Sequence, residues 1–214
     1  MRPTQKAAIA LIAGAIIHAA GGIVGQVVRA STDVSDDLFR YPWTSDAFVV
    51  LSLCEAVAFG LGVVGFAGLR ASGVAGPTRA ARVGLGLALT ASALFAVTQL
   101  ASIFVRDQPL DDGAAGALGG LFGLGTLLLG AGLTAAGVAA RRAGRWEGWR
   151  PTALLACGVW TLGMLGIVLT DVMPLGVAVM GLLQLSVGIG LLTRPIAASA
   201  SARTDGTTAS IALR

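Results

Sequence analysis

The sequence predicts an all-α integral membrane protein with six transmembrane helices packed in a compact, glycine-rich bundle. Of its 214 residues, 55% are hydrophobic and only 12% are charged, whereas soluble domains average about a quarter charged residues. Six apolar segments can be drawn, at about 7–28, 46–69, 83–105, 114–140, 152–170 and 174–193. Each is near the roughly 20 residues that a helix needs to cross a bilayer. Residues 1–194 therefore form one predicted transmembrane domain.

The charges at the ends of these segments predict the orientation. If the segments alternate in direction, twelve of the fifteen Lys and Arg residues lie on one side and three on the other. The three are Arg29, Arg40 and Arg106, and their side also carries eight Asp residues. Because cytoplasmic loops are rich in Lys and Arg, we expect both termini in the cytoplasm. The net charge of +4 then reflects topology, so the expected partners are the lipid bilayer and anionic headgroups, not nucleic acid.

The first segment, residues 7–28, contains His18, the single histidine of the chain. A cleaved signal peptide usually has an apolar run of about 7–15 residues, so we expect this longer run to be a retained helix. Gly14, Gly21 and Gly25 lie on the same face as His18. Small and polar faces of this kind favour contact with another helix over contact with lipid.

The second segment follows a polar connection, residues 29–45. Tyr41 and Trp43 are typical of aromatic residues at the headgroup level, and Thr44 or Ser45 is expected to cap the helix. The segment itself contains Glu55, the one acidic residue that lies within an apolar run. Such a residue inside a membrane span is a candidate for function.

The third segment carries Gln99, Ser102 and Arg106 toward its outer end, on one helical face. Gln26 and Arg29 occupy the outer end of the first segment. These five residues form a second candidate site, which we call the outer polar stripe.

The fourth segment contains Gly116 and Gly120, and also Gly119 and Gly123, each pair four residues apart. This spacing allows two helix backbones to approach closely. We expect these glycines to pack against another helix. The partner is a helix of the same chain, a second copy of the protein, or another membrane protein.

Trp146 and Trp149 precede the fifth segment and are expected at the inner headgroup level. Thr161 lies in the fifth segment and Gln184 in the sixth. Residues 195–214 are rich in Ala, Ser and Thr and lack an apolar period, which predicts a disordered cytoplasmic tail.

Four polar side chains share one depth in the predicted bilayer. Counting at 1.5 Å per residue places His18, Glu55 and Gln184 about 13–15 Å below the outer boundary, with Thr161 at a similar level. A lone charge at mid-bilayer costs about 2.5–3.5 kcal/mol or more, so such groups face inward and pair. Since the first two segments are joined by one loop, we expect His18 to contact Glu55. The four residues form the candidate intramembrane polar site.

This site has two main interpretations. In the first, which we favour, the polar groups only join helices, and the protein is a small structural or accessory membrane component. In the second, they line a mid-membrane pocket of a protein that binds or transports a small molecule or protons. A packed His18–Glu55 contact favours the first, and an internal cavity that reaches it favours the second. A membrane enzyme acting on an apolar substrate ranks third, because no second reactive group converges on the site.

Several other chemistries find no support in the sequence. One histidine, with both cysteines inside apolar segments, offers no pattern for a metal site, a haem or another cofactor. His18 has no hydrolase motif around it, and the Gly-x-Gly fragments follow no predicted strand. No resemblance to a known family is evident. Abundant Ala, Gly and Arg with a single Lys are typical of GC-rich bacteria, so we expect a bacterial inner (plasma) membrane.

Overall fold

A computed structural model describes residues 1–168 and 170–193, and this part of the chain is helical with no β-strand. The predicted tail, residues 195–214, lies outside the described residues. The elements are α1 (Pro3–Arg29), α2 (Ser45–Ala71), α3 (Arg79–Val105), α4 (Gly113–Ala143), α5 (Arg150–Gly163), the short 3-10 helix η1 (Met164–Gly166) and α6 (Met173–Leu192).

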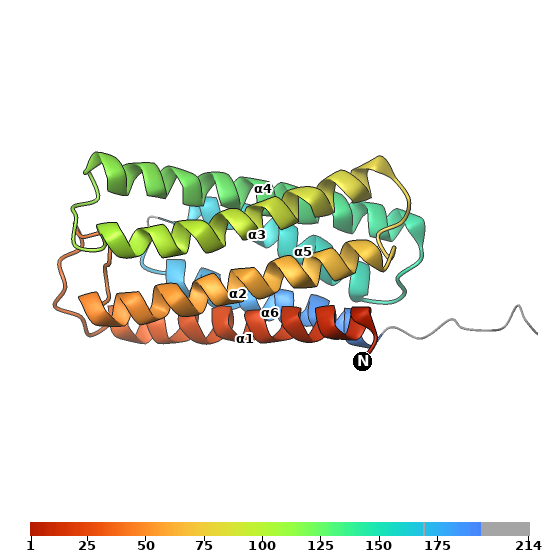
Figure 1. The fold of residues 1–214 in the computed structure, drawn as a ribbon, viewed down its shortest axis with the longest axis horizontal. Coiled ribbons are helices and arrows are strands. Elements are labelled where there is room, and N and C mark those ends of the chain that lie inside the picture. Colours follow the sequence, from red (N-terminus) through yellow and green to blue (C-terminus); the bar gives the residue numbers. More distant parts are fainter. Residues whose placement is uncertain (169, 194–214) are drawn as a thin grey trace, which may run out of the picture.

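The helices run side by side along the long axis of the molecule (Figure 1). Each packs against its neighbours in the chain, and α6 also packs against α1, so the order around the bundle is closed. We call the end formed by residues 30–44, 106–112, 167–168 and 170–172 the acidic end. The opposite end, with residues 72–78 and 144–149 and the N-terminus, is called the basic end (right in Figure 1).

Five helices, α1–α4 and α6, are long and apolar enough to cross a membrane, as expected of a membrane-embedded protein. The fifth predicted segment is shorter than expected, because α5 has 14 residues and is followed by only three residues of η1. Gly163 and Gly166 lie at this transition, and glycine weakens a helix interior by about 0.5–1 kcal/mol. Together α5 and η1 measure about 27 Å, against about 30 Å of hydrocarbon. The count of six spans therefore stays a prediction.

Local sequence signals explain where the helices begin and end. The side chains of Thr44, Thr78 and Asp112 accept hydrogen bonds from the backbone N–H groups of Ala47, Ala81 and Ala114, which caps α2, α3 and α4. Thr44 is thus the cap of α2. Helices α1, α5 and α6 instead have a proline in their first turn, where its missing N–H costs nothing. Gly144 ends α4 in the left-handed conformation, with φ of +61°.

Glycines bring several helix pairs into close contact. Gly22 on α1 faces the backbone of Pro174 and Ala178 on α6, so that a side chain at Gly22 would overlap that backbone. Gly84 on α3 and Gly132 on α4 face one another in the same way. These contacts allow the tight packing that glycine permits between membrane helices.

The glycine pairs predicted on α4 do not take part in this packing. Within the described part of the chain, no atom lies within 4 Å of a side chain placed at Gly119, Gly120 or Gly123, and Gly116 meets only a carbonyl oxygen at 4.0 Å. The reason is position: α4 packs against α3 and α5 mainly through Gly125, Gly130, Gly132 and Gly137, closer to the basic end. In the acidic-end half of α4, the face that carries these glycines is therefore open toward the surroundings of the bundle.

The two tryptophans before α5 differ in environment. Trp149 is 49% exposed, as expected for a residue at the headgroup level, but Trp146 is only 2% exposed. Trp146 lies in the connection at the basic end but is covered by the protein, so its side chain is not exposed to headgroups as that of Trp149 is. Gly190 of α6 explains the burial, because a side chain there would lie 3.2 Å from the Trp146 ring.

Candidate intramembrane polar site

His18 on α1 contacts Glu55 on α2 within the bundle. The Nδ1 atom of His18 lies 2.6 Å from Oε2 of Glu55, and the two residues are 1% and 6% exposed. One proton must lie between these atoms, carried either by the imidazole as donor or by the carboxyl group as donor. The contact expected from the shared depth of the two residues is thus present.

The surrounding residues close tightly around this pair. The ring of Phe59, one turn along α2 from Glu55, has its centroid 4.5 Å from that of His18. On α1, a side chain at Gly21 would lie 2.7 Å from the second carboxylate oxygen, Oε1 of Glu55. The glycine therefore makes room for the carboxyl group between the two helices.

A row of aromatic rings begins at this pair and crosses four helices. Phe59 of α2 stacks on Phe95 of α3, with centroids 4.6 Å apart and an angle of 21° between the rings. The ring centroid of Phe95 in turn lies 6.1 Å from that of Phe122 of α4. Each of the helices α1–α4 thus contributes one ring, with His18 as the first member. Contacts of this kind stabilise a core beyond the apolar area that they bury.

The other two residues of the predicted site do not join the pair. The Thr161 hydroxyl donates to the Cys157 carbonyl oxygen of its own helix, at 2.8 Å. Gln184 is buried on α6, but among the described residues none forms a hydrogen bond with its side chain. A common depth along the helices does not determine that side chains point toward one another.

Two buried hydroxyl groups lie beside the pair, on α2 and α3. Ser52, one turn from Glu55, lies 3.4 Å from Ser102, oxygen to oxygen. Ser102 donates its own hydrogen to the Gln99 carbonyl oxygen at 2.7 Å, so Ser52 is the donor in the contact between the two serines. Thr98, also buried, has no hydrogen-bond partner for its hydroxyl oxygen among the described residues. The three-residue spacing of Ser52 and Glu55 already places both on one face of the second segment.

Comparison with protein-family models, curated proteins and solved structures finds no match for this chain. The described residues contain no group of three or more His, Cys, Asp or Glu side chains that could hold a metal ion. The pair can share a proton and can join α1 to α2.

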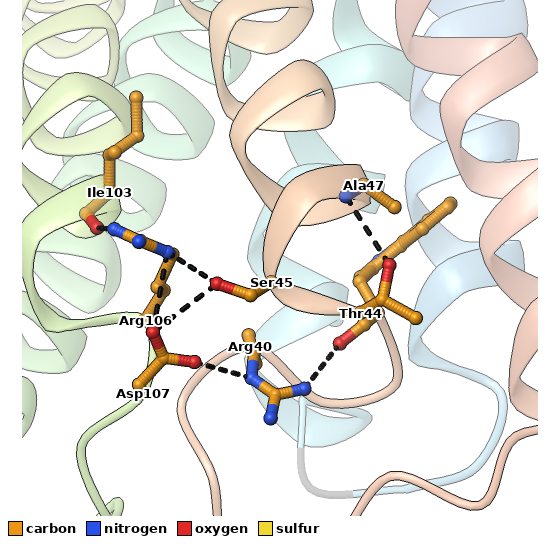
Figure 2. A network of polar contacts seen from close by, with 8 residues as sticks. Arg40, Thr44, Ser45, Ala47, Ile103, Arg106 and Asp107 are labelled. Carbon is orange, nitrogen blue, oxygen red and sulfur yellow. Dashed lines mark hydrogen bonds and ion pairs between the residues drawn. The ribbon is translucent and has the colours of Figure 1, made fainter.

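The outer polar stripe divides into two separate clusters at the acidic end. In the first, the Arg106 Nε atom donates to the Ser45 hydroxyl at 2.7 Å, and Ser45 donates to Asp107 at 3.2 Å. Asp107 also accepts a hydrogen bond from Arg40 at 2.8 Å (Figure 2). Gln99 and Ser102 are not bonded to this cluster within the described residues: Ser102 donates to the Gln99 carbonyl oxygen and contacts Ser52.

The second cluster lies around α1 and the connection between η1 and α6. Arg29 forms an ion pair with Asp171 and lies over the Tyr41 ring at 5.0 Å from its centroid. Gln26 has a buried side-chain oxygen without a hydrogen-bond partner. These residues line a surface hollow of about 320 Å³. A larger hollow of about 660 Å³ lies beside residues 31–35 and 40–44, and neither hollow includes His18 or Glu55.

Proposed function

We propose that the chain is a bacterial plasma-membrane protein that crosses the membrane six times, with both termini in the cytoplasm. The segregation of arginines supports this orientation. At the acidic end eight aspartates outnumber Arg29, Arg40 and Arg106, so this end has a net negative charge. Each of the three arginines forms an ion pair with an aspartate. The Arg29–Asp171 pair supports a full crossing by α5, because it holds the connection before α6 at the acidic end.

We further propose that the protein is a structural or accessory component of the membrane. The observation that carries this proposal is the His18–Glu55 contact, which is short, buried and closely covered by Phe59 and Gly21. A polar pair of this kind joins two helices, because neither group has an alternative partner in the hydrocarbon region.

Lipid is the partner that the charge distribution favours. Among the described residues, the arginines of the basic end, including Arg141, Arg142 and Arg145, form no ion pair. Basic groups at the cytoplasmic surface attract anionic headgroups, by about 1 kcal/mol for each residue near the surface. A homo-oligomer or a second membrane protein would fit the exposed half of α4.

The structural role is tested by replacing the pair with groups that form hydrogen bonds but cannot ionise. In the double variant His18→Asn, Glu55→Gln, an amide replaces each partner, with the Asn amide near the position of Nδ1. We expect this variant to keep its melting temperature in detergent and to restore the phenotype of a strain that lacks the gene. The variant His18→Ala, Glu55→Ala is the disruptive control. A stable amide variant that fails to restore the phenotype would refute a purely structural role.

That outcome would favour the second candidate function, a protein that binds or transports a small molecule or protons. The specific observation behind it is the presence of Ser52, Ser102 and Thr98 on one side of the pair. Catalysis on an apolar substrate has less support, because the described residues bring no further reactive group to His18 and Glu55.

A further inference from the structure

We propose that the His18–Glu55 pair is a protonation site that exchanges protons with the compartment at the acidic end and is closed toward the basic end. The path consists of the hydroxyl groups between α2 and α3. This inference goes beyond the structural role, because a helix contact requires no access to solvent.

The path begins one helical turn from the pair. Ser52 precedes Glu55 by three residues on α2, which corresponds to about 4.5 Å along the helix. Ser52 contacts Ser102 of α3, and both serines are buried. Thr98 precedes Ser102 by one turn on α3, in the direction of the basic end, so these hydroxyl groups extend toward the depth of the carboxyl group.

The hydrogen bonds in this region are incomplete. Ser102 donates to the Gln99 carbonyl oxygen and accepts from Ser52, whereas the Thr98 oxygen has no partner. A buried hydroxyl without a partner costs roughly 1–3 kcal/mol. A water molecule removes this cost where several polar groups line one space. Thr98 is therefore the hydroxyl group in this region to which a water molecule would supply the missing hydrogen bond.

Polar residues continue from there to the surface. Arg106 lies one turn beyond Ser102 on α3, and Ser45 lies two turns before Ser52 on α2. These two residues form the cluster with Asp107 that is drawn in Figure 2. Phe48 of α2 and Val105 of α3 are buried apolar residues between this cluster and the two serines, so the polar groups on this side form two levels, the surface cluster and the serines.

In the other direction the space between the helices is apolar. Toward the basic end, Phe59, Phe66 and Leu69 of α2 are buried, together with Leu85 of α3. Ser92 is the buried polar residue on this side, and it donates to a carbonyl oxygen of its own helix at 2.9 Å. Among the described residues of α2 and α3, the buried hydroxyl groups nearest to Glu55 along the helices are thus Ser52 and Thr98, whereas Ser92 lies farther toward the basic end and is bonded to its own helix.

The charged groups near Glu55 are few. The helices packed against α2 are α1 and α3. From α1, His18 faces the carboxyl group, and from α3 the nearest charged side chain along the path is Arg106 at the surface. The described part of the bundle thus offers His18 as the one titratable partner at this depth.

Two serines of the same helix provide a matched test. With Cys54 and Cys157 replaced by Ala, Ser102→Cys and Ser92→Cys each place one thiol at a buried position of α3. Silver ion, small and charged, is added to sealed proteoliposomes or vesicles from one side. Cysteines that remain unreacted are then alkylated under denaturing conditions and counted by mass spectrometry.

When silver ion is added from the acidic end, the thiol of Ser102→Cys is expected to react about 100-fold faster than that of Ser92→Cys. The silver ion and the thiolate with which it reacts are both charged, and the apolar interior of the bundle disfavours charge, so fast reaction requires a polar path. From the basic end, neither thiol is expected to react at a comparable rate. Equal rates for the two positions, or faster reaction of Ser92→Cys from the basic end, would overturn the proposal.

Proton exchange at the pair is measured directly by NMR of the His18 ring N–H in nanodiscs. Ser102→Val is expected to slow this exchange about tenfold, because it removes one hydrogen-bonding group from the path and the free energy of one hydrogen bond corresponds to about a factor of ten in rate. Ser92→Val is the control and should leave the rate unchanged. An unchanged rate in Ser102→Val would contradict the path. It would leave the structural role intact, since that role depends on the His18–Glu55 contact alone.

Discussion

Asp171 forms an ion pair with Arg29, although the two residues are 142 positions apart in the sequence. Arg29 is the last residue of α1, and Asp171 lies just before α6. The pair therefore fixes the connection before α6 at the acidic end. As a consequence, the chain from α5 through η1 to Asp171 extends from the basic end to the level at which α1 ends.

This relationship predicts the topology around α5. In a variant without native cysteines, Thr170→Cys and Asp111→Cys should react with a bulky, impermeant maleimide added outside intact cells. Arg145→Cys should react only after the membrane is permeabilised. If Thr170→Cys instead behaves like Arg145→Cys, α5 does not cross the membrane and the count of spans is five.

The His18–Glu55 contact predicts a measurable coupling between the two residues. Glu55→Ala leaves a buried imidazole without its partner, so it should lower the free energy of unfolding in detergent. A double-mutant cycle with His18→Ala should give a coupling of roughly 0.6–1.7 kcal/mol, as for other polar pairs between membrane helices. Val57→Ala, at a 57% exposed position of the same helix, is the control. A coupling near zero would mean that the contact contributes no stability.

The glycine contacts predict opposite results for two Gly→Ala substitutions. Gly22→Ala places a methyl group against the backbone of α6, which cannot move as a flexible side chain can. It should destabilise the protein by about 1–3 kcal/mol, as overpacking does. In Gly120→Ala the added methyl group points into open space. Because alanine has a higher helix propensity than glycine, the melting temperature of this variant should stay equal or rise. Thermal unfolding of both variants, side by side, checks the sign of each effect.

Asp107 predicts a more modest effect at the acidic end. Asp107→Asn removes the charge that binds Arg40 and Arg106, but the aspartate side chain is 54% exposed. Exposed ion pairs contribute about 0–1 kcal/mol each, and backbone bonds such as Phe39 to Gln108 remain. We expect a loss of at most about 1 kcal/mol, larger than for Asp111→Asn. Residues 30–44 should also be cleaved faster by a protease in Asp107→Asn than in the unsubstituted protein. If Asp107→Asn loses no more free energy of unfolding than Asp111→Asn, the ion pairs of Asp107 do not contribute to stability.

Much of the helical architecture follows from one-dimensional properties of the sequence. Apolar length predicted the five long helices, and Thr44 marked the start of α2. The His18–Glu55 contact was also predictable, because a buried acid requires a partner and the one histidine lies at the same depth in the neighbouring helix. In each case a strong physical penalty leaves few alternatives.

The rest depends on rotation about the helix axes and on fit between surfaces. Gln184 and Thr161 share the depth of the pair, but depth gives no information about direction. The glycine spacing on α4 permits close packing without specifying a partner. Trp146 is buried because Gly190, on another helix, leaves space for its ring. Such pairings become visible only when the helices are placed together.

The row of rings from His18 to Phe122 has a consequence for how the bundle moves. A helix can slide along its axis or turn about it. The glycine contacts of α1, such as Gly22 against α6, restrict sliding because backbone meets backbone. The ring contacts restrict turning, since each flat side chain is held between rings or helices on either side. The last ring of the row, Phe122, thus connects these contacts to α4, the helix that carries the open glycine face.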